Sequence, residues 1–529
     1  MLSISFYTNA QIFYQFDLNP NGDSKPFNFL VCNNLLFFAA CDTNFRPPKL
    51  WVSDGTVGGT HKIGSAALPA IGYEFPMAAL NNECFFTATT GDAGTELWKS
   101  DGTAAGTVIV KDINPGSGSG LVNTYLTACN GNVYFFAYDG TNNGLWKSDG
   151  TEAGTQLVKI VGAYPYLTAY NNEIYFSGSN DTQVGSELWK SDGTTGGTAM
   201  LKEINPGSGS SCPNYFTVYN GKLYFSAMDN INKYQLWVTD GTVSGTEMVA
   251  NITQSNPGSY GAEPSALAVC NNLLYFQAND HVNGIQPWCS DGTAGGTHIL
   301  KSINSPGGCN PYDFIACNNK VYFICDDNVH GEEVWISDGT SGGTQLLSYI
   351  ASGPYTSSHP AYLTVYNNKV YFRANDESTG DELWVTDGTN TGTHILQPSY
   401  INIGSDLTYG SSFMVYDNRL YFCSDYGPVG IELYAFSDMP SSVFDLKDYA
   451  DNIKLYPNPA NDLINLETIQ CATSDSYFIE ITNIQGQLIK SMELKDINTS
   501  IDISGLQSGV YIVKVETEKE ITVKKFVKE

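Results

Sequence analysis

Apolar and polar positions along most of the chain follow one pattern that returns every 43 to 51 residues. The clearest copy is LTVYNNKVYFRAND at residues 363–376, in which Asn-Asn joins two apolar runs. Asn and Gly tolerate the positive φ angles of a two-residue type I′ turn, so each copy predicts a tight β-hairpin. We expect nine such turns, beginning at Asn33, Asn81, Asn130, Asn171, Asn220, Asn271, Asn318, Asn367 and Asp417.

The second half of each copy centres on an aromatic residue followed by a Gly-rich turn. All eight tryptophans stand before x-[ST]-D-G-T-x-x-G-T, at Trp51, Trp98, Trp146, Trp189, Trp237, Trp288, Trp335 and Trp384, and a ninth copy has Tyr434 instead. With one strand on each side of this turn, a copy has four strands, which is typical of a β-propeller blade. Because both faces of a blade pack on neighbours, the runs are apolar throughout, and we expect the tryptophans to be buried there.

The fold class is therefore all-β, with a nine-bladed β-propeller over residues 11–438. The ninth copy lacks a fourth strand, whereas QIFYQFDLNPNGDS at residues 11–24 resembles a fourth strand with its exit loop. Pairing of this N-terminal strand with the last copy would close the ring and remove exposed sheet edges. An eight-bladed ring with one irregular copy, or two smaller arrays, are the alternatives.

A different pattern begins after the repeats. Residues 439–454 read as a linker, and residues 455–529 contain four short alternating segments divided by turn residues. This spacing predicts a compact, immunoglobulin-like β-sandwich.

Several motifs of this last segment occur in an order that resembles a known family, the type A C-terminal sorting domain of the type IX secretion system of the Bacteroidetes. The motif residues are Tyr456, Pro457, Asn458, Pro459, Asp462, Asn483, Gly486, Leu506, Gly509, Val510 and Tyr511. The resemblance implies that the type IX machinery is a partner and that the protein is secreted or attached to the outer-membrane surface. The repeats resemble the ELWxxDGT repeat family, which brings no defined activity.

Residues 1–10 read as the remnant of a signal peptide. Thr8 and Ala10 suit a signal-peptidase cut before Gln11, but no Lys or Arg precedes Lys25 and the apolar stretch is short. The signal thus looks incomplete, as it would with a start codon placed too late; a frayed leader is the alternative.

Charge narrows the range of partners. The chain has 26 Lys and Arg residues and 54 Asp and Glu residues, so its formal net charge is −28. A protein this acidic repels the phosphate backbone, which disfavours nucleic acid as a partner. No run of 18 apolar residues is present, so no transmembrane segment is expected.

Cysteine and histidine give no support to catalysis. Cys32, Cys129, Cys270 and Cys317 share a repeat position with tyrosines, which indicates a buried apolar position more than a set of disulfides. No metal-binding Cys or His spacing occurs, and no catalytic residue is predicted.

Acidic residues fall into three repeated positions. The Asp before Gly-Thr is expected to form its turn, and the Glu of the ELW segment, because it repeats, to be structural. A third set opens the loops between second and third strands, at Asp139, Asp181, Asp229, Asp280, Asp326, Asp376 and Asp425. Oxygen donors of this kind suit Ca²⁺, so these are candidate calcium ligands, and otherwise no cofactor is expected.

The sequence therefore predicts an exported binding or adhesion protein that recognises a glycan or another extracellular polymer with its loops. A secreted carbohydrate-active enzyme, either a glycosidase or a lyase, is the alternative; its catalytic carboxylates should break the repeat in one or two copies. A structural surface protein is the third.

Overall fold

The computed structural model describes residues 12–43, 47–64, 70–71, 77–121, 125–179, 185–254, 258, 260–351, 353, 356–396, 413–425, 430–438, 453–468, 477–483, 488–494, 499–516 and 521–529. These residues form strands and no helix, so they contain no helix that could cross a membrane. Contacts divide the chain into two units, one holding Phe13–Phe436 and the other Ser437–Glu529. The all-β prediction is confirmed.

The described part of the first unit forms nine antiparallel sheets, numbered here 1 to 9 by the order of their first strands. The first strands are β2 (Phe27–Cys32), β7 (Ala78–Leu80), β11 (Thr127–Cys129), β15 (Gly162–Tyr170), β19 (Asn214–Tyr219), β23 (Ser265–Cys270), β27 (Tyr312–Cys317), β31 (Ala361–Tyr366) and β35 (Met414–Tyr416). The second strands are β3 (Leu35–Ala40), β8 (Glu83–Thr90), β12 (Asn132–Tyr138), β16 (Glu173–Ser179), β20 (Lys222–Asp229), β24 (Leu273–Asn279), β28 (Lys320–Asp326), β32 (Lys369–Asn375) and β36 (Arg419–Asp425).

The outer half of each sheet follows in the same order. The third strands are β4 (Lys49–Ser53), β9 (Gly94–Ser100), β13 (Asn143–Ser148), β17 (Glu187–Ser191), β21 (Lys233–Thr239), β25 (Ile285–Ser290), β29 (Glu332–Ser337), β33 (Asp381–Thr386) and β37 (Ile431–Ser437). The fourth strands are β5 (His61–Lys62), β10 (Val108–Lys111), β14 (Gln156–Ile160), β18 (Ala199–Lys202), β22 (Glu247–Ala250), β26 (His298–Ile299), β30 (Gln345–Leu346), β34 (His394–Ile395) and, in sheet 9, β1 (Ile12–Phe16). Sheet 2 has a fifth strand, β6 (Ala70–Ile71), paired with β8.

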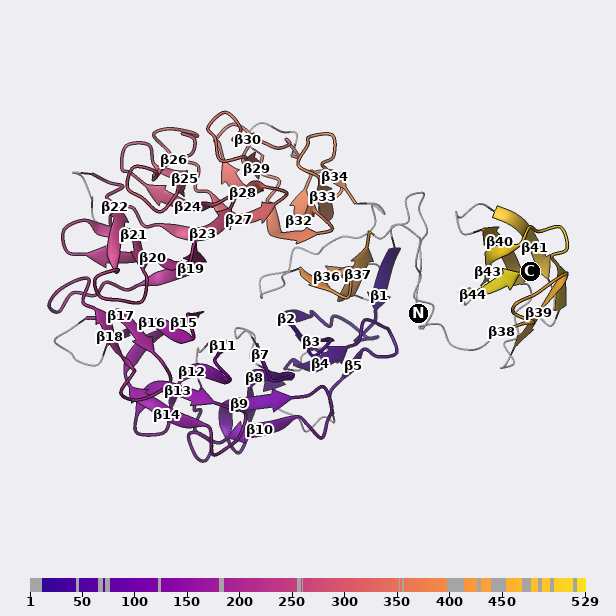
Figure 1. Cartoon of the computed structure of the whole chain (residues 1–529), viewed down its shortest axis with the longest axis horizontal. Coiled ribbons are helices and arrows are strands. Elements are labelled where there is room, and N and C mark those ends of the chain that lie inside the picture. Colours follow the sequence, from indigo (N-terminus) through magenta and orange to yellow (C-terminus); the bar gives the residue numbers. More distant parts are fainter. Residues whose placement is uncertain are drawn as a thin grey trace. The chain divides into compact units, whose positions relative to one another are not determined.

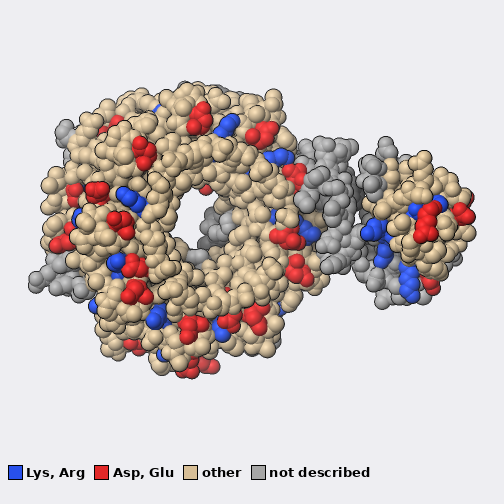
Figure 2. Space-filling model, viewed as in Figure 1, with Lys and Arg blue, Asp and Glu red and all other residues tan. Residues whose placement is uncertain are grey.

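The sheets follow one another around a ring, and their first strands lie at its inner edge (Figure 1). First strands of neighbouring sheets contact one another, for example β23 with β27 and β27 with β31. The space-filling view shows an opening in the middle of this ring (Figure 2). The first strands therefore border the opening.

The nine expected hairpin turns are confirmed. Both central residues have positive φ in every turn, from 51° and 56° at Asn33 and Asn34 to 46° and 53° at Asp417 and Asn418. These values match a type I′ turn, which explains why Asn, Asp and Gly occupy these two positions.

The core lies between neighbouring sheets. Between sheets 3 and 4, for example, Leu145 and Phe176 are both 0% exposed, and Trp189, which belongs to the same cluster, is 3% exposed. Such packing on both faces accounts for apolar runs that do not alternate with polar residues. The described cysteines are free thiols, and Cys32, Cys129, Cys270 and Cys317 are buried.

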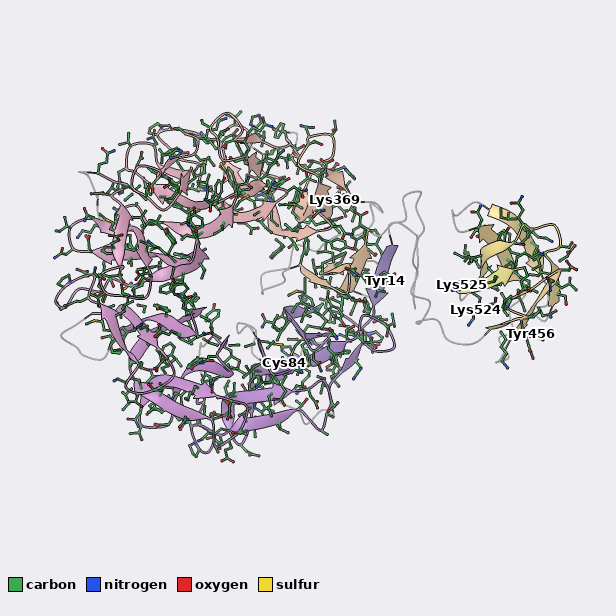
Figure 3. All side chains as sticks on the ribbon, viewed as in Figure 1. Tyr14, Cys84, Lys369, Tyr456, Lys524 and Lys525 are labelled. Atoms are coloured by element: carbon green, nitrogen blue, oxygen red, sulfur yellow. The ribbon has the colours of Figure 1, made fainter. Side chains whose placement is uncertain are left out.

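The N-terminal strand β1 lies beside β37 and supplies the fourth strand of sheet 9. Phe13 packs against Phe436 with ring centroids 5.1 Å apart, and the Arg419 guanidinium lies 4.3 Å from the ring centroid of Tyr14, labelled in Figure 3. The Tyr416 hydroxyl donates a hydrogen bond to the Asn34 carbonyl at 2.6 Å, which joins sheet 9 to sheet 1. The two ends of the repeat array thus meet.

The described part of the second unit has two sheets around one core. One contains β38 (Ile453–Tyr456), β39 (Leu463–Thr468) and β42 (Thr499–Asp502); the other contains β41 (Leu488–Leu494), β40 (Tyr477–Asn483), β43 (Gly509–Glu516) and β44 (Ile521–Lys528). Their inward residues, such as Ile464, Ile481 and Val513, are 0% exposed. This arrangement is a β-sandwich.

Candidate functional site

The Asp-Gly-Thr segments build the turn between third and fourth strands. In sheet 3, Asp149 Oδ1 accepts hydrogen bonds from the backbone N–H of Thr151 at 2.9 Å and from its hydroxyl at 2.7 Å. These bonds favour the charged carboxylate and lower the pKa of Asp149. The same pair of bonds occurs at Asp54, Asp101, Asp192, Asp240, Asp291, Asp338 and Asp387.

The Glu of the ELW segment is buried and holds the connection to the next sheet. Glu187 is 0% exposed, and its carboxylate accepts hydrogen bonds from the Ile204 N–H at 2.7 Å and the Ser211 hydroxyl at 2.6 Å. Backbone N–H groups bind in the same way to Glu96, Glu333 and Glu432, and to the amide oxygens of Gln235 and Gln286. These carboxyl groups have a structural task.

The candidate calcium ligands do not gather into one site. Asp139 Oδ1 accepts the N–H groups of Thr141 at 2.9 Å and Asn142 at 2.6 Å, so it closes its own loop. Asp229, Asp280 and Asp376 also accept backbone N–H groups of their own loops. Asp326 accepts the Asn328 N–H. Asp425 is exposed at the end of β36, and Asp181 lies outside the described residues. Within the described ranges, no three His, Cys, Asp or Glu side chains are grouped to hold a metal.

The described sorting-motif residues make hydrogen bonds within the β-sandwich. Asn458, which lies between Pro457 and Pro459, accepts the Val527 N–H at 2.9 Å and donates to the Lys525 carbonyl at 2.9 Å; Lys525 is labelled on β44 in Figure 3. The carbonyl of Asp462 accepts the Ile503 N–H at 2.8 Å. Gly509 begins β43, the Tyr511 hydroxyl donates to the Gln507 carbonyl at 2.9 Å, and Gly486 lies outside the described residues.

Tyrosines recur at the start of the first strands, on the side opposite the hairpin turns. In four of the nine copies they stand five positions before the first residue of the turn, at Tyr125, Tyr166, Tyr215 and Tyr362. Tyr166 and Tyr215 are each 54% exposed, and the rings of Tyr125 and Tyr166 lie 4.8 Å apart between sheets 3 and 4. We call these four residues together with Tyr312, which is 36% exposed on β27, the tyrosine mouth.

The backbone at this position is unusual. Residues Tyr215 and Tyr362 have φ of 55° and 62°, and the pairing of their strands shifts register at this point. Asn28, Ala266 and Asp313, at the same position in sheets 1, 6 and 7, have φ of 53°, 54° and 53°. Positive φ at residues other than Gly costs free energy and often accompanies functional sites.

The mouth has one charged corner, between sheets 7 and 8. Asp313 Oδ2 accepts the N–H of Leu363 at 3.1 Å, and burial raises the pKa of its carboxyl. The Arg373 guanidinium lies 5.9 Å from the ring centroid of Tyr362. Its Nη1 is 3.7 Å from Asp381 Oδ2.

Glu332 connects this corner to a histidine. Its Oε2 lies 3.3 Å from His359 Nδ1, and the Tyr312 hydroxyl hydrogen-bonds to the same carboxylate. Burial and the nearby charges of Glu332 and Asp313 raise the pKa of Tyr312. We call Tyr312, Asp313, Glu332, Tyr362 and Arg373 the charged corner.

Neither the tyrosine mouth nor the charged corner was predicted. A signal for four of the five mouth tyrosines was available, because they stand five positions before their hairpin turns, whereas Tyr312 stands six positions before Asn318. Arg373 also departs from the repeat, since Gln277 and Ile324 occupy its position in sheets 6 and 7. Only the fold shows that Asp313 of sheet 7 lies beside Tyr362 and Arg373 of sheet 8.

By architecture, the first unit belongs to the class of β-propellers, in which four-stranded sheets surround a central channel. Residues 454–529 match the family model described as the secretion system C-terminal sorting domain. The prediction that this segment is a type IX sorting domain is therefore confirmed. The protein is exported by the type IX secretion system and is either secreted or attached to the outer-membrane surface.

Comparison with curated proteins returns no match. Among solved structures, the chain is similar to PorZ of Porphyromonas gingivalis, described as an essential bacterial surface component of the type-IX secretion system, with 12% identity, TM-score 0.38, and coverage of 100% of this chain and 75% of that one. It is also similar to a puromycin hydrolase, with 14% identity, TM-score 0.36, and coverage of 79% of this chain. The chain spans 61% of that hydrolase.

Proposed function

We propose that the nine sheets are the nine blades of an exported binding or adhesion module, and that its tyrosine mouth takes a glycan or a comparable extracellular polymer. The exposed tyrosines at the opening support this proposal most directly. The resemblance of residues 11–438 to the ELWxxDGT repeat family is compatible with such a module.

The other repeated polar groups have structural partners. The turn aspartates, and Glu96, Glu187, Glu333 and Glu432 of the ELW segments, are held by backbone N–H groups, as Asp149 and Glu187 illustrate. In contrast, Tyr166 and Tyr215 expose more than half of their surface on strands that border the opening. Aromatic faces with nearby polar groups suit ligands that present both apolar and hydroxyl-bearing surfaces, as sugars do.

The test is a glycan-array screen of the full chain, followed by calorimetry with the oligosaccharides that bind. We expect Tyr166→Ala and Tyr215→Ala each to weaken binding about 3- to 10-fold, because each removes one stacking face. Tyr456→Ala, at a tyrosine 46% exposed in the second unit, is the matched control and should bind as the wild type does. If all three variants bind the oligosaccharide with the same affinity, the tyrosine mouth is not the binding site.

The same assay in a calcium chelator tests the expected cation. The candidate calcium ligands bind calcium only if chelation lowers the affinity for the oligosaccharide or the melting temperature. No change in either would leave these residues with their turn-forming role alone.

A carbohydrate-active enzyme is the second candidate, favoured by one observation. Asp313 and Glu332 are carboxylates at the mouth outside the three repeated acidic positions. Release of reducing ends or unsaturated products from a bound polysaccharide, lost in Asp313→Asn, would support it. Binding without turnover would argue against it.

A further inference from the structure

The charged corner stands out because most of the mouth is uncharged. The positions equivalent to Asp313 carry Tyr215 in sheet 5 and Ala266 in sheet 6, and the position of Arg373 carries Gln277 in sheet 6. A guanidinium and two carboxylates therefore lie on one side of a mouth whose equivalent positions, such as Asn28, Tyr215, Ala266 and Gln277, are uncharged. The tyrosines alone would bind a ligand in several orientations, whereas charged groups on one side of the mouth favour one of them.

The corner carries an excess of negative charge. The carboxylates of Asp313 and Glu332 face one guanidinium, that of Arg373. Arg373 also has Asp381 as a neighbour, 3.7 Å away. A ligand carboxylate or sulfate placed here would meet more like charge than opposite charge.

Hydrogen-bonding capacity is nevertheless left over. Arg373 Nε is buried and has no hydrogen-bond partner among the described residues. Asp313 Oδ2 accepts one backbone N–H, whereas its second oxygen can accept more. The Arg373 side chain as a whole is 16% exposed, so a ligand at the corner can accept a hydrogen bond from its guanidinium.

Neighbouring sugar hydroxyls fit this arrangement. Each hydroxyl both donates and accepts, so one can donate to a carboxylate while the next accepts from a guanidinium. The Tyr362 ring beside Arg373 supplies an apolar face for the sugar ring.

We infer that the charged corner is the specificity subsite of the mouth: it accepts a neutral sugar residue with neighbouring hydroxyls and excludes uronate and sulfated polymers. This inference rests on the proposed function. Arg373 and Asp313 are the residues that determine the choice.

The test uses the full chain and two sets of probes. Neutral hexasaccharides of the cello, laminari and manno series are compared with alginate and galacturonate oligosaccharides by calorimetry. We expect the wild type to bind at least one neutral series and to bind the acidic oligosaccharides at least tenfold more weakly. Arg373→Gln should weaken neutral binding about tenfold, because hydrogen bonds to a charged group are stronger than neutral ones.

Asp313→Asn keeps an oxygen that accepts the Leu363 N–H, so the strand contact should persist in this variant. It should narrow the difference between neutral and acidic probes by reducing repulsion. Lys320→Gln, which removes a charge beside the hairpin turn at the other end of the strands, is the matched control and should change neither affinity nor preference. Melting temperatures of all variants check that the ring stays folded.

The outcomes separate the two proposals. If Tyr166→Ala weakens binding but Arg373→Gln and Asp313→Asn change neither affinity nor preference, the subsite is wrong and the binding function stands. Stronger wild-type binding of acidic probes also overturns the subsite. If neither probe set binds and the tyrosine variants behave as the wild type on the glycan array, both proposals fail.

Discussion

A buried carboxylate recurs in the ELW segment of five sheets, although burial of a lone charge is costly. The side chains of Glu96, Glu187 and Glu333 are each 0% exposed. Each accepts backbone N–H bonds from the connection to the next sheet, which would otherwise lack partners in the interior. Gln235 and Gln286 make the equivalent bond at 2.9 Å, so a neutral oxygen suffices.

Burial raises the pKa of Glu96, Glu333 and Glu432 to about 7 and that of Glu382 to about 8. The folded protein therefore binds more protons than the unfolded chain above the ordinary Glu pKa of about 4.3. This contribution to stability is fully present below the ordinary Glu pKa, decreases as the pH rises above about 4.3, and is lost once the pH passes 7 to 8. We expect a higher melting temperature at pH 5.5 than at pH 8.5.

The turn aspartates do not oppose this trend. Their lowered pKa, as at Asp101 and Asp149, acts only below the ordinary Asp value of about 3.9. The matched variant replaces Glu96, Glu333, Glu382 and Glu432 with Gln, as two sheets already have. It should flatten the dependence of melting temperature on pH; an unchanged slope would show that other groups cause it.

At the scale of elements, each Asp-Gly-Thr turn also contacts the sheet before it. Gly193 has φ of 85°, and a Cβ there would lie 2.2 Å from the Tyr134 hydroxyl of the neighbouring sheet. Gly is therefore required in this turn for two reasons: the backbone has a positive φ, and there is no room for a Cβ atom. The repeat positions of Gly and Tyr are coupled between sheets that are distant in sequence.

Gly193→Ala should lower the free energy of unfolding by about 1–3 kcal/mol, because it forces strain at positive φ and displaces Tyr134. Gly196→Ala, three residues later in the same turn with nothing within 4 Å of its added Cβ, is the control. It should change stability by less than about 0.5 kcal/mol. Urea unfolding of both variants measures the difference; equal losses would contradict the contact argument.

At the largest scale, the first unit holds together through a strand that comes from the other end of the array. Phe16 on β1 is 1% exposed and packs in the cluster that contains Tyr421 of sheet 9 and Trp51 of sheet 1. The Leu18 N–H donates to Glu432 at 2.8 Å. The closing strand thus serves both the last and the first sheet.

Phe16→Ala should destabilise the first unit by about 3–5 kcal/mol, since it leaves a cavity at the closure. Ile160→Ala on β14, also a fourth strand but 58% exposed, should cost less than about 0.5 kcal/mol. Denaturant unfolding and limited proteolysis compare the two. A small loss for Phe16→Ala would mean that the array holds together without its closing strand.

The sequence by itself determined the local structure and the destination of the protein. Asn-Asn and Asn-Gly turns, Asp-Gly-Thr turns and apolar strands depend on neighbouring residues, so a pattern such as residues 363–376 predicts them directly. The sorting domain was likewise visible in short motifs such as residues 456–459.

Tertiary structure decided which side chains remain available for binding. The candidate calcium ligands were visible in sequence, and the fold adds that Asp139 and Asp280 accept N–H groups of their own loops. Tyr166, Tyr215 and Arg373 carry no local signal of exposure or partnership, because these depend on which strands border the opening and which sheets are neighbours. Residues of different sheets come close only when the ring is closed by the pairing of β1 with β37. A pattern of neighbouring residues in the sequence therefore cannot predict which of them meet.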